Sequence, residues 1–172
     1  LRRETDRGVN AVQAITKDLR DFEKSRRSGK RYNHRRINLL MRIVVDTSVV
    51  IAVIADEPEK ARLIELTKGA VIVVPPSVKW EIGNAFSAML KRSRLNLEQA
   101  IDAIDAYQSI SMEIVEINLK DAVRLAGKYN IYAYDAYILQ CAIEYKLPLL
   151  SLDAGMIETA RQESIQVIDV TS

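Results

Sequence analysis

Short apolar runs alternate with longer segments of helical periodicity from residue 41 to the end of the chain. The apolar runs predict strands near 42–46, 70–74, 112–117, 148–152 and 166–169. The segments between them predict helices near 47–55, 58–68, 76–93, 97–108, 118–129, 133–146 and 154–163. Strands that alternate with helices in this way are typical of βαβ units. The pattern therefore predicts an α/β fold with a parallel central sheet.

The first 40 residues follow a different pattern. Apolar residues recur every three or four positions from Val9 to Phe22, which predicts an amphipathic helix. Residues 1–40 carry 12 Lys and Arg against 5 Asp and Glu, whereas residues 41–172 carry 13 against 18. A change of charge this abrupt marks a boundary. We therefore expect a basic helical extension and linker at 1–40 and a folded domain at 41–172 that starts at Met41.

The composition narrows the classes of protein to consider. No apolar stretch approaches the roughly 20 residues that span a bilayer, and residues 1–40 lack the apolar core of a secretory signal. The cytoplasm is therefore the expected location. The chain has one histidine, His34, and one cysteine, Cys141, whose apolar neighbours predict a packed side chain. Intramolecular disulfides, cysteine zinc clusters and paired-histidine chemistry are thus excluded, and any catalysis must depend on carboxylates.

Four carboxylates fall where the predicted fold can turn them toward one point. Asp46 and Asp153 directly follow predicted strands, and the carboxyl ends of parallel strands meet at one edge of a sheet. Glu81 and Asp135 lie near the starts of predicted helices among apolar residues, where an unpaired carboxylate is unfavourable. Each acid alone also has a structural explanation. Asp46, Asp135 and Asp153 can each cap a helix, and Glu81 can lie on a solvated helix face.

Taken together, the acids predict a metal site. Two carboxylates about 4 Å apart repel by about 4 kcal/mol at an effective dielectric near 20, so a converging set requires protonation or bound cations. Oxygen ligands without His or Cys suit Mg²⁺ or Mn²⁺, and such ions promote phosphodiester hydrolysis. Neighbouring polar side chains are expected to orient the ligands: Thr47, Ser48, Asn84 and Ser151. For the three hydroxyl residues, a cap or a strand-end hydrogen bond explains the position equally well.

Four stretches surround these acids: Met41–Ser48, Pro76–Ala85, Tyr134–Tyr137 and Leu150–Asp153. They resemble the motifs of PIN-domain proteins, and more closely those of VapC-type toxins from toxin–antitoxin pairs. The resemblance covers essentially all of 41–172. It implies a three-layer α/β/α sandwich, Mg²⁺- or Mn²⁺-dependent cleavage of RNA, frequent homodimerisation and inhibition by a cognate antitoxin. It also implies the metal-binding and catalytic residues Asp46, Glu81, Asp135 and Asp153, of which Asp153 occupies the most variable position.

Other interpretations stay open. Related nucleases process DNA or ribosomal RNA with the same kind of site, and a PIN-like domain can be a non-catalytic scaffold, although the four retained acids argue against that. A receiver or aspartyl phosphatase also uses a strand-end aspartate, but Asp46-Thr47-Ser48 lacks the second aspartate of a phosphatase. Residues 1–40 depart from toxins of this kind, which usually begin at the position of Met41. An upstream start, a remnant of a neighbouring reading frame and an antitoxin-like inhibitory tail each explain the extension.

The negative charge of 41–172 argues against a strongly basic surface for nucleic acid. Local basic patches are still available on the predicted helices: Lys79, Lys91, Arg92, Arg94, Lys120, Arg124 and Lys128. Ordinary solvated helix surface is the alternative explanation. Contacts to phosphate would make RNA binding weaken as salt rises.

Overall fold

The computed structural model describes residues 41–170, so the extension predicted at 1–40 lies outside the described residues. Four parallel strands form one sheet in the order β3-β2-β1-β4. They are β1 (Arg42–Val45), β2 (Val71–Val74), β3 (Met112–Ile114) and β4 (Leu149–Leu150). The predicted parallel α/β fold is confirmed.

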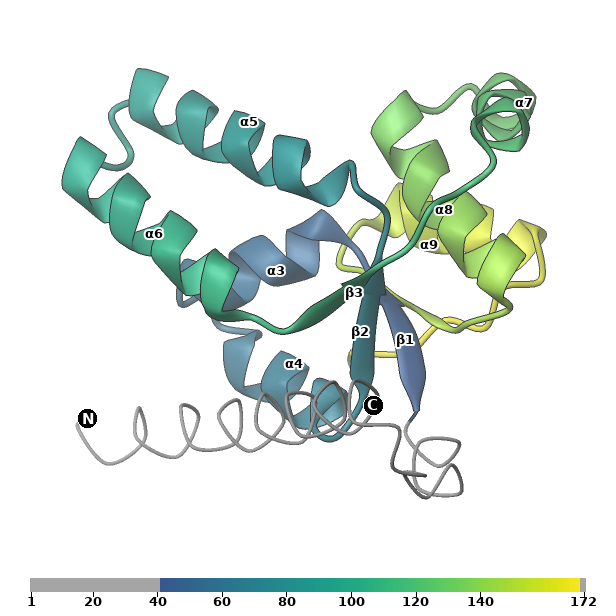
Figure 1. The fold of residues 1–172 in the computed structure, drawn as a ribbon, viewed down its shortest axis with the longest axis horizontal. Coiled ribbons are helices and arrows are strands. Elements are labelled where there is room, and N and C mark those ends of the chain that lie inside the picture. Colours follow the sequence, from purple (N-terminus) through teal and green to yellow (C-terminus); the bar gives the residue numbers. More distant parts are fainter. Residues whose placement is uncertain (1–40, 171–172) are drawn as a thin grey trace, which may run out of the picture.

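Helices cover both faces of the sheet. They are α3 (Thr47–Ile54), α4 (Lys60–Thr67), α5 (Val78–Lys91), α6 (Leu97–Ser109), α7 (Leu119–Tyr129), α8 (Ala133–Tyr145) and α9 (Ala154–Gln162). Figure 1 shows α3 to α6 on one side of the sheet and α7 to α9 on the other, which gives the predicted three-layer sandwich. No helix among residues 41–170 is long and apolar enough to cross a membrane.

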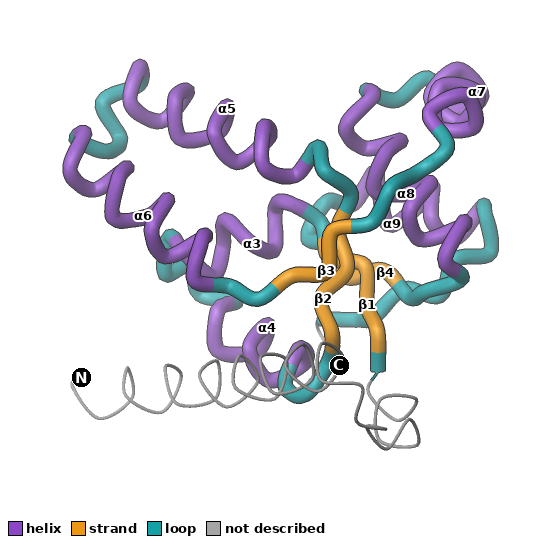
Figure 2. Tube along the Cα trace, in the orientation of Figure 1, coloured by secondary structure: helices purple, strands orange, loops and turns teal. Residues whose placement is uncertain are grey.

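Helices α5 and α6 form an antiparallel pair that extends away from the sheet. Figure 2 shows the short loop that joins them at the outer end. We call this pair, together with its loop, the α5–α6 arm. Helix α5 follows β2 and runs outward, so it begins beside the sheet and ends far from it.

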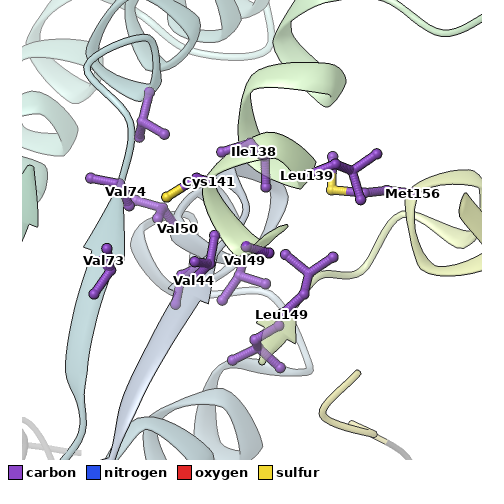
Figure 3. Packing of buried hydrophobic residues seen from close by; sticks show 14 of the residues in the cluster. Val44, Val49, Val50, Val73, Val74, Ile138, Leu139, Cys141, Leu149 and Met156 are labelled. Carbon is purple, nitrogen blue, oxygen red and sulfur yellow. The ribbon is translucent and has the colours of Figure 1, made fainter. Parts of the chain in front are cut away.

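Strand β1, inside the sheet, is buried on both faces. Ile43, Val44 and Val45 of β1 are at most 1% exposed, as expected for a parallel strand between two helical layers. Figure 3 shows how side chains of the strands, α3, α8 and α9 pack together, among them Val44, Val49, Val50, Val73, Ile138, Cys141 and Met156. Burial raises the pKa of the Cys141 thiol to about 12, so Cys141 packs as an apolar residue, as the sequence predicted.

Three of the predicted strands differ from the structure, and the one expected at 148–152 is reduced to Leu149–Leu150. The strand expected at 112–117 ends at Ile114, because β2 ends at Val74 and the following Pro75 has no N–H for a ladder bond. The strand expected at 166–169 is wrong, since Val167 alone forms a bridge, to Leu149. The two-residue β4 offers too little backbone for a longer pairing.

The helix predicted from residue 76 begins at Val78 instead. Pro75 and Pro76 precede it, and Ser77 occupies the N-cap position. The amides of Trp80 and Glu81 donate hydrogen bonds to the Ser77 carbonyl at 2.9 and 3.1 Å. A shift of this size is typical of the way helix ends vary, and it leaves Glu81 in the first turn of α5.

Helix α6 begins at a capping box. The Asn96 side chain accepts a hydrogen bond from the Gln99 amide at 2.8 Å, and the Gln99 side chain accepts one from the Asn96 amide at 3.0 Å. We predict that Asn96→Ala lowers the free energy of unfolding by about 1 kcal/mol, measured by urea denaturation of the full chain. The control Gln108→Ala, exposed on the same helix but outside the cap, should change it by less than about 0.5 kcal/mol. Equal effects would contradict the capping role.

Candidate active site

The four predicted acids lie at the starts of four helices. Asp46 follows β1 at the N-cap position of α3, and Asp153 holds the same position on α9. Glu81 and Asp135 lie in the first turns of α5 and α8. The N-terminus of a helix carries a partial positive charge that stabilises an anion. The carboxyl end of the sheet therefore gathers carboxylates at positions where the backbone favours negative charge.

Asp46 is the most buried of these acids, with 3% of its surface exposed. Its Oδ2 accepts a hydrogen bond from Ser48 Oγ at 2.5 Å and another from Ser151 Oγ at 2.8 Å. Asp46 holds the N-cap position, but no amide of α3 donates to its side chain with full hydrogen-bond geometry, and the nearby amides of Thr47 and Ser48 only help to lower its pKa. Burial raises the pKa of Asp46, and the hydrogen bonds from the two serine hydroxyls offset that rise only in part.

The same two serines tie the end of β1 to the segment after β4. Ser151 Oγ also accepts a hydrogen bond from the Asp153 amide at 3.0 Å, and Ser48 Oγ accepts one from the Leu152 amide at 3.2 Å. Each hydroxyl therefore donates to Asp46 and accepts from the backbone that leads to α9. This arrangement fixes the position of Asp46 relative to Asp153.

Asp153 caps α9, and the capping interpretation of this residue is confirmed. Its Oδ1 accepts a hydrogen bond from the Met156 amide at 2.7 Å. A Cβ added at Gly155 would lie 3.2 Å from the same Oδ1, so glycine avoids a crowded contact with this carboxylate. The cap engages one carboxylate oxygen and leaves the second available to a ligand.

Glu81 is half-buried and does not lie on a solvated face as the alternative interpretation expected. Thr47 Oγ1 donates a hydrogen bond to Glu81 Oε2 at 2.5 Å. Burial raises the pKa of Glu81, the Thr47 hydrogen bond lowers it, and the charges of Asp46 and Asp135 raise it further. Asn84 lies exposed one turn along α5, and its side chain makes no hydrogen bond within residues 41–170.

Asp135 is the third residue of α8, because Tyr132 occupies the N-cap position. Asp135 is therefore not the N-cap itself, although its carboxylate lies close enough to the Tyr132 amide for that N–H to lower its pKa. Burial raises the pKa of Asp135, and the charges of Asp153 and Asp46 add to that rise. Through these interactions Asp135 is coupled to each of the other three acids.

The acids interact electrostatically, but they do not form a ready-made metal cage. Within residues 41–170, no group of three or more His, Cys, Asp and Glu side chains is arranged to hold a metal ion. Asp46, Glu81 and Asp153 instead accept hydrogen bonds from protein donors. The donor set nevertheless fits a hard divalent cation, because its ligands are all oxygen atoms and the cation would relieve the repulsion between neighbouring carboxylates.

Ser77 is a polar residue near the site that the sequence analysis did not single out. Its Oγ is buried and has no hydrogen-bond partner within the described part of the chain. Serine is a common N-cap residue, so its position directly before the helix that carries Glu81 could have pointed to Ser77. The Ser77 side chain nevertheless makes no capping hydrogen bond.

Asp46→Asn is predicted to raise the free energy of unfolding in EDTA at neutral pH. The folded-state pKa of Asp46 is raised, so its contribution to stability is complete below the unfolded-state pKa of about 3.9 and is lost as pH rises through the folded-state value. Asparagine carries no charge to bury, and its Oδ1 can accept both serine hydrogen bonds. Urea denaturation between about pH 4 and 7 should show the advantage of the variant growing with pH. The matched control is Asp102→Asn at an exposed position on α6, and the same trend in both variants would contradict the assignment.

Residues 43–162 match the family model of the PIN domain. No curated protein matches the chain significantly in sequence. Among solved structures, PAE2754 from Pyrobaculum aerophilum is 20% identical with a TM-score of 0.57, over 74% of this chain and 83% of that one. VapBC-1 from nontypeable Haemophilus influenzae is 18% identical with a TM-score of 0.53, over 77% and 100%. A toxin–antitoxin complex from Klebsiella pneumoniae is 17% identical with a TM-score of 0.51, over 74% and 97%.

The identities to these solved structures establish a shared fold and nothing finer. The family match is more specific, because its span runs from β1 to the end of α9 and contains Asp46, Glu81, Asp135 and Asp153. It also agrees with the sheet order and with the helical layers described above. The chain belongs to the PIN domain family.

Proposed function

We propose that this protein is a metal-dependent endoribonuclease of the VapC type, the toxin of a toxin–antitoxin pair. PIN domains are generally nucleases. The observation that carries the proposal is the set of partly buried, mutually repelling carboxylates Asp46, Glu81 and Asp135 at the carboxyl end of a parallel sheet. The toxin role is supported by the structural neighbours, which include VapBC-1 and a toxin–antitoxin complex.

In this proposal the metal ligands and catalytic groups are Asp46, Glu81, Asp135 and Asp153, with Mg²⁺ or Mn²⁺ as the cation. Asp46 and Asp135 are the principal ligands. Ser48 and Ser151 hold the Asp46 carboxylate in a fixed orientation, and Thr47 does the same for Glu81. Removing a supporting hydrogen bond of this kind typically lowers metal affinity or activity 10- to 100-fold. Asn84 completes the polar surroundings from the exposed side of α5.

The cation, when bound, supplies an activated water and neutralises charge on the phosphodiester. The chain's own residues would orient the substrate and accept the proton that the attacking water loses. Glu81 suits the second task, because burial and its acidic neighbours raise its pKa and thereby make it a better base near neutral pH. Its hydrogen bond to Thr47 engages Oε2 and leaves Oε1 to face a water.

The partners in this proposal are an RNA substrate, a cognate antitoxin and a second copy of the chain, in the cytoplasm. The α5–α6 arm offers apolar surface that a protein partner can cover, since Leu97 and Ile101 of α6 are 68% and 53% exposed. Exposed apolar groups one helical turn apart are typical of binding surfaces. We also propose that the nuclease domain starts at Met41 and that residues 1–40 form a separate extension.

The test of the proposed function is cleavage of a panel of tRNA and rRNA by the full chain. With Mg²⁺ or Mn²⁺ we expect discrete products, and with EDTA none. Asp46→Asn should lower the cleavage rate at least about 100-fold, since it removes a charged ligand that helps to stabilise the transition state. Asp102→Asn, the matched change at an exposed position away from the acids, should cleave like the parent.

Cleavage that persists in EDTA, or equal cleavage by Asp46→Asn and Asp102→Asn, would contradict the proposal. The proposal would also be contradicted if the folded parent chain, freed of any bound antitoxin, cleaved no RNA. A parallel DNA panel identifies DNA processing if DNA alone is cut. If neither RNA nor DNA is cut, the function of a partner-binding scaffold is favoured.

A further inference from the structure

The outer face of α6 leaves a row of apolar side chains uncovered. Leu97 is 68% exposed and Ile101 is 53% exposed, and Ile104, one turn further along, is only partly buried. Residues three and four positions apart lie on one face of a helix, so these three form a continuous row, which we call the α6 row. It begins where α6 begins, at the outer end of the arm and away from the acidic site (Figure 2).

Negative charge borders the α6 row. Helix α6 contains three Asp and Glu residues and no Lys or Arg. Glu98 and Asp105 are exposed next to the row, and neither forms an ion pair within residues 41–170. Two copies of such a face repel each other, because like charges that meet across an interface are unfavourable. The surface that fits the α6 row is therefore apolar with positive charge beside it.

Helix α7 presents a similar apolar pair in the opposite electrostatic setting. Leu119 and Val123 are each 58% exposed and have the same i, i+4 spacing as Leu97 and Ile101. Helix α7, however, contains three Lys and Arg residues against one Asp. A basic segment would therefore be attracted to the α6 row and repelled by α7, although both helices expose apolar side chains.

The chain itself contains a segment of matching chemistry. The apolar stripe that predicts an amphipathic helix runs from Val9 to Phe22. The 14 residues that follow, 23–36, carry seven Lys and Arg against one Glu. An isolated helix of about 14 residues is marginal in water, and most of the stability of an amphipathic helix comes from packing of its apolar face. Residues 9–36 thus combine a stripe that needs a cover with a strongly basic run beside it.

The connection to the domain is long enough for this segment to reach the α6 row. The described part of the chain begins at Met41, whose carbonyl accepts a hydrogen bond from the Val71 amide at 2.8 Å, at the start of the sheet. Between Phe22 and Met41 lie 18 residues, which span up to about 60 Å when extended. A compact domain of about 130 residues has a radius of gyration of roughly 14 Å. The reach of the connection therefore exceeds the width of the domain.

We infer that the α6 row is the docking site for residues 9–22 of the same chain, with the basic run at 23–36 beside Glu98 and Asp105. Tethering favours this contact, because a short linker gives a bound segment an effective concentration in roughly the millimolar range. The docked segment covers the outer end of the arm and leaves the acidic site open, so the inference does not depend on the proposed nuclease activity. A partner protein that uses the arm must first displace residues 9–22.

The test is amide hydrogen–deuterium exchange of the full chain, read by mass spectrometry over residues 9–22. The parent should show protected amides there, because an undocked helix of this length opens readily. Changing Leu97 and Ile101 together to Ser should speed the exchange of residues 9–22 at least about 10-fold, since their apolar contact is lost. The matched control changes Leu119 and Val123 of α7 to Ser and should exchange like the parent. The amides of β1 should stay protected in every chain.

A second pair of variants tests the charge without changing the α6 row. Glu98→Lys combined with Asp105→Lys should also speed the exchange of residues 9–22, because the basic run then meets like charge. In the parent, added salt should weaken the protection, since screening reduces the attraction between exposed charges. In the charge-reversed chain, added salt should restore part of the protection, because it screens the repulsion instead.

Four outcomes would overturn the inference. Rapid exchange of residues 9–22 in the parent would show that they do not dock. Equal exchange in the α6 and α7 variants, or protection that charge reversal leaves unchanged, would place any contact elsewhere. Protection that rises with protein concentration would assign the α6 row to a second copy of the chain. Because exchange is measured without RNA or metal, absence of cleavage would remove the proposed function and leave this result standing.

Discussion

The arrangement of this domain depends on burying a carboxylate, Asp46, within reach of other carboxylates. An isolated buried charge is unfavourable, and like charges nearby make it more so. Two serine hydroxyls donate to Asp46, one from α3 and one from the residue after β4. They stabilise the acid without neutralising it. The remaining electrostatic cost is the physical reason to expect a cation at this point.

The parallel sheet explains why the acids meet. β1 and β4 are hydrogen-bonded neighbours, so the segments that follow them leave the sheet together, and Ser151 links them by hydrogen bonds to Asp46 and to the Asp153 amide. β2 pairs with β1 on the other flank and leads through a proline turn into α5, which brings Glu81 in from the opposite helical layer. Asp135 comes from α8, which packs against β1. The site is thus assembled by the core packing of both layers, and the α5–α6 arm extends its surface beyond the sheet.

Sequence patterns predicted the elements well because β1, β2 and β4 are short runs of apolar residues, and because a residue such as Asn96 marks a helix start by its own chemistry. Hydrogen bonds between side chains far apart in the sequence were harder to predict. Asp46 and Asp153 both hold N-cap positions, yet only Asp153 accepts a capping hydrogen bond with full geometry, whereas Asp46 accepts one from Ser151, 105 positions away. The hydrogen bond from Thr47 to Glu81 likewise depends on how α3 packs against α5. The strand predicted at 166–169 failed because its partner β4 is short.

The most direct test of the account is a titration of the full chain with Mn²⁺, in which electron paramagnetic resonance reports the free ion. The parent and Asp102→Asn should bind Mn²⁺ with the same affinity, whereas Asp46→Asn should bind at least about 10-fold more weakly, because the central carboxylate is gone. Equal affinity for all three chains, or no Mn²⁺ binding by the parent, would contradict the claim that the repelling carboxylates around Asp46 form a cation site.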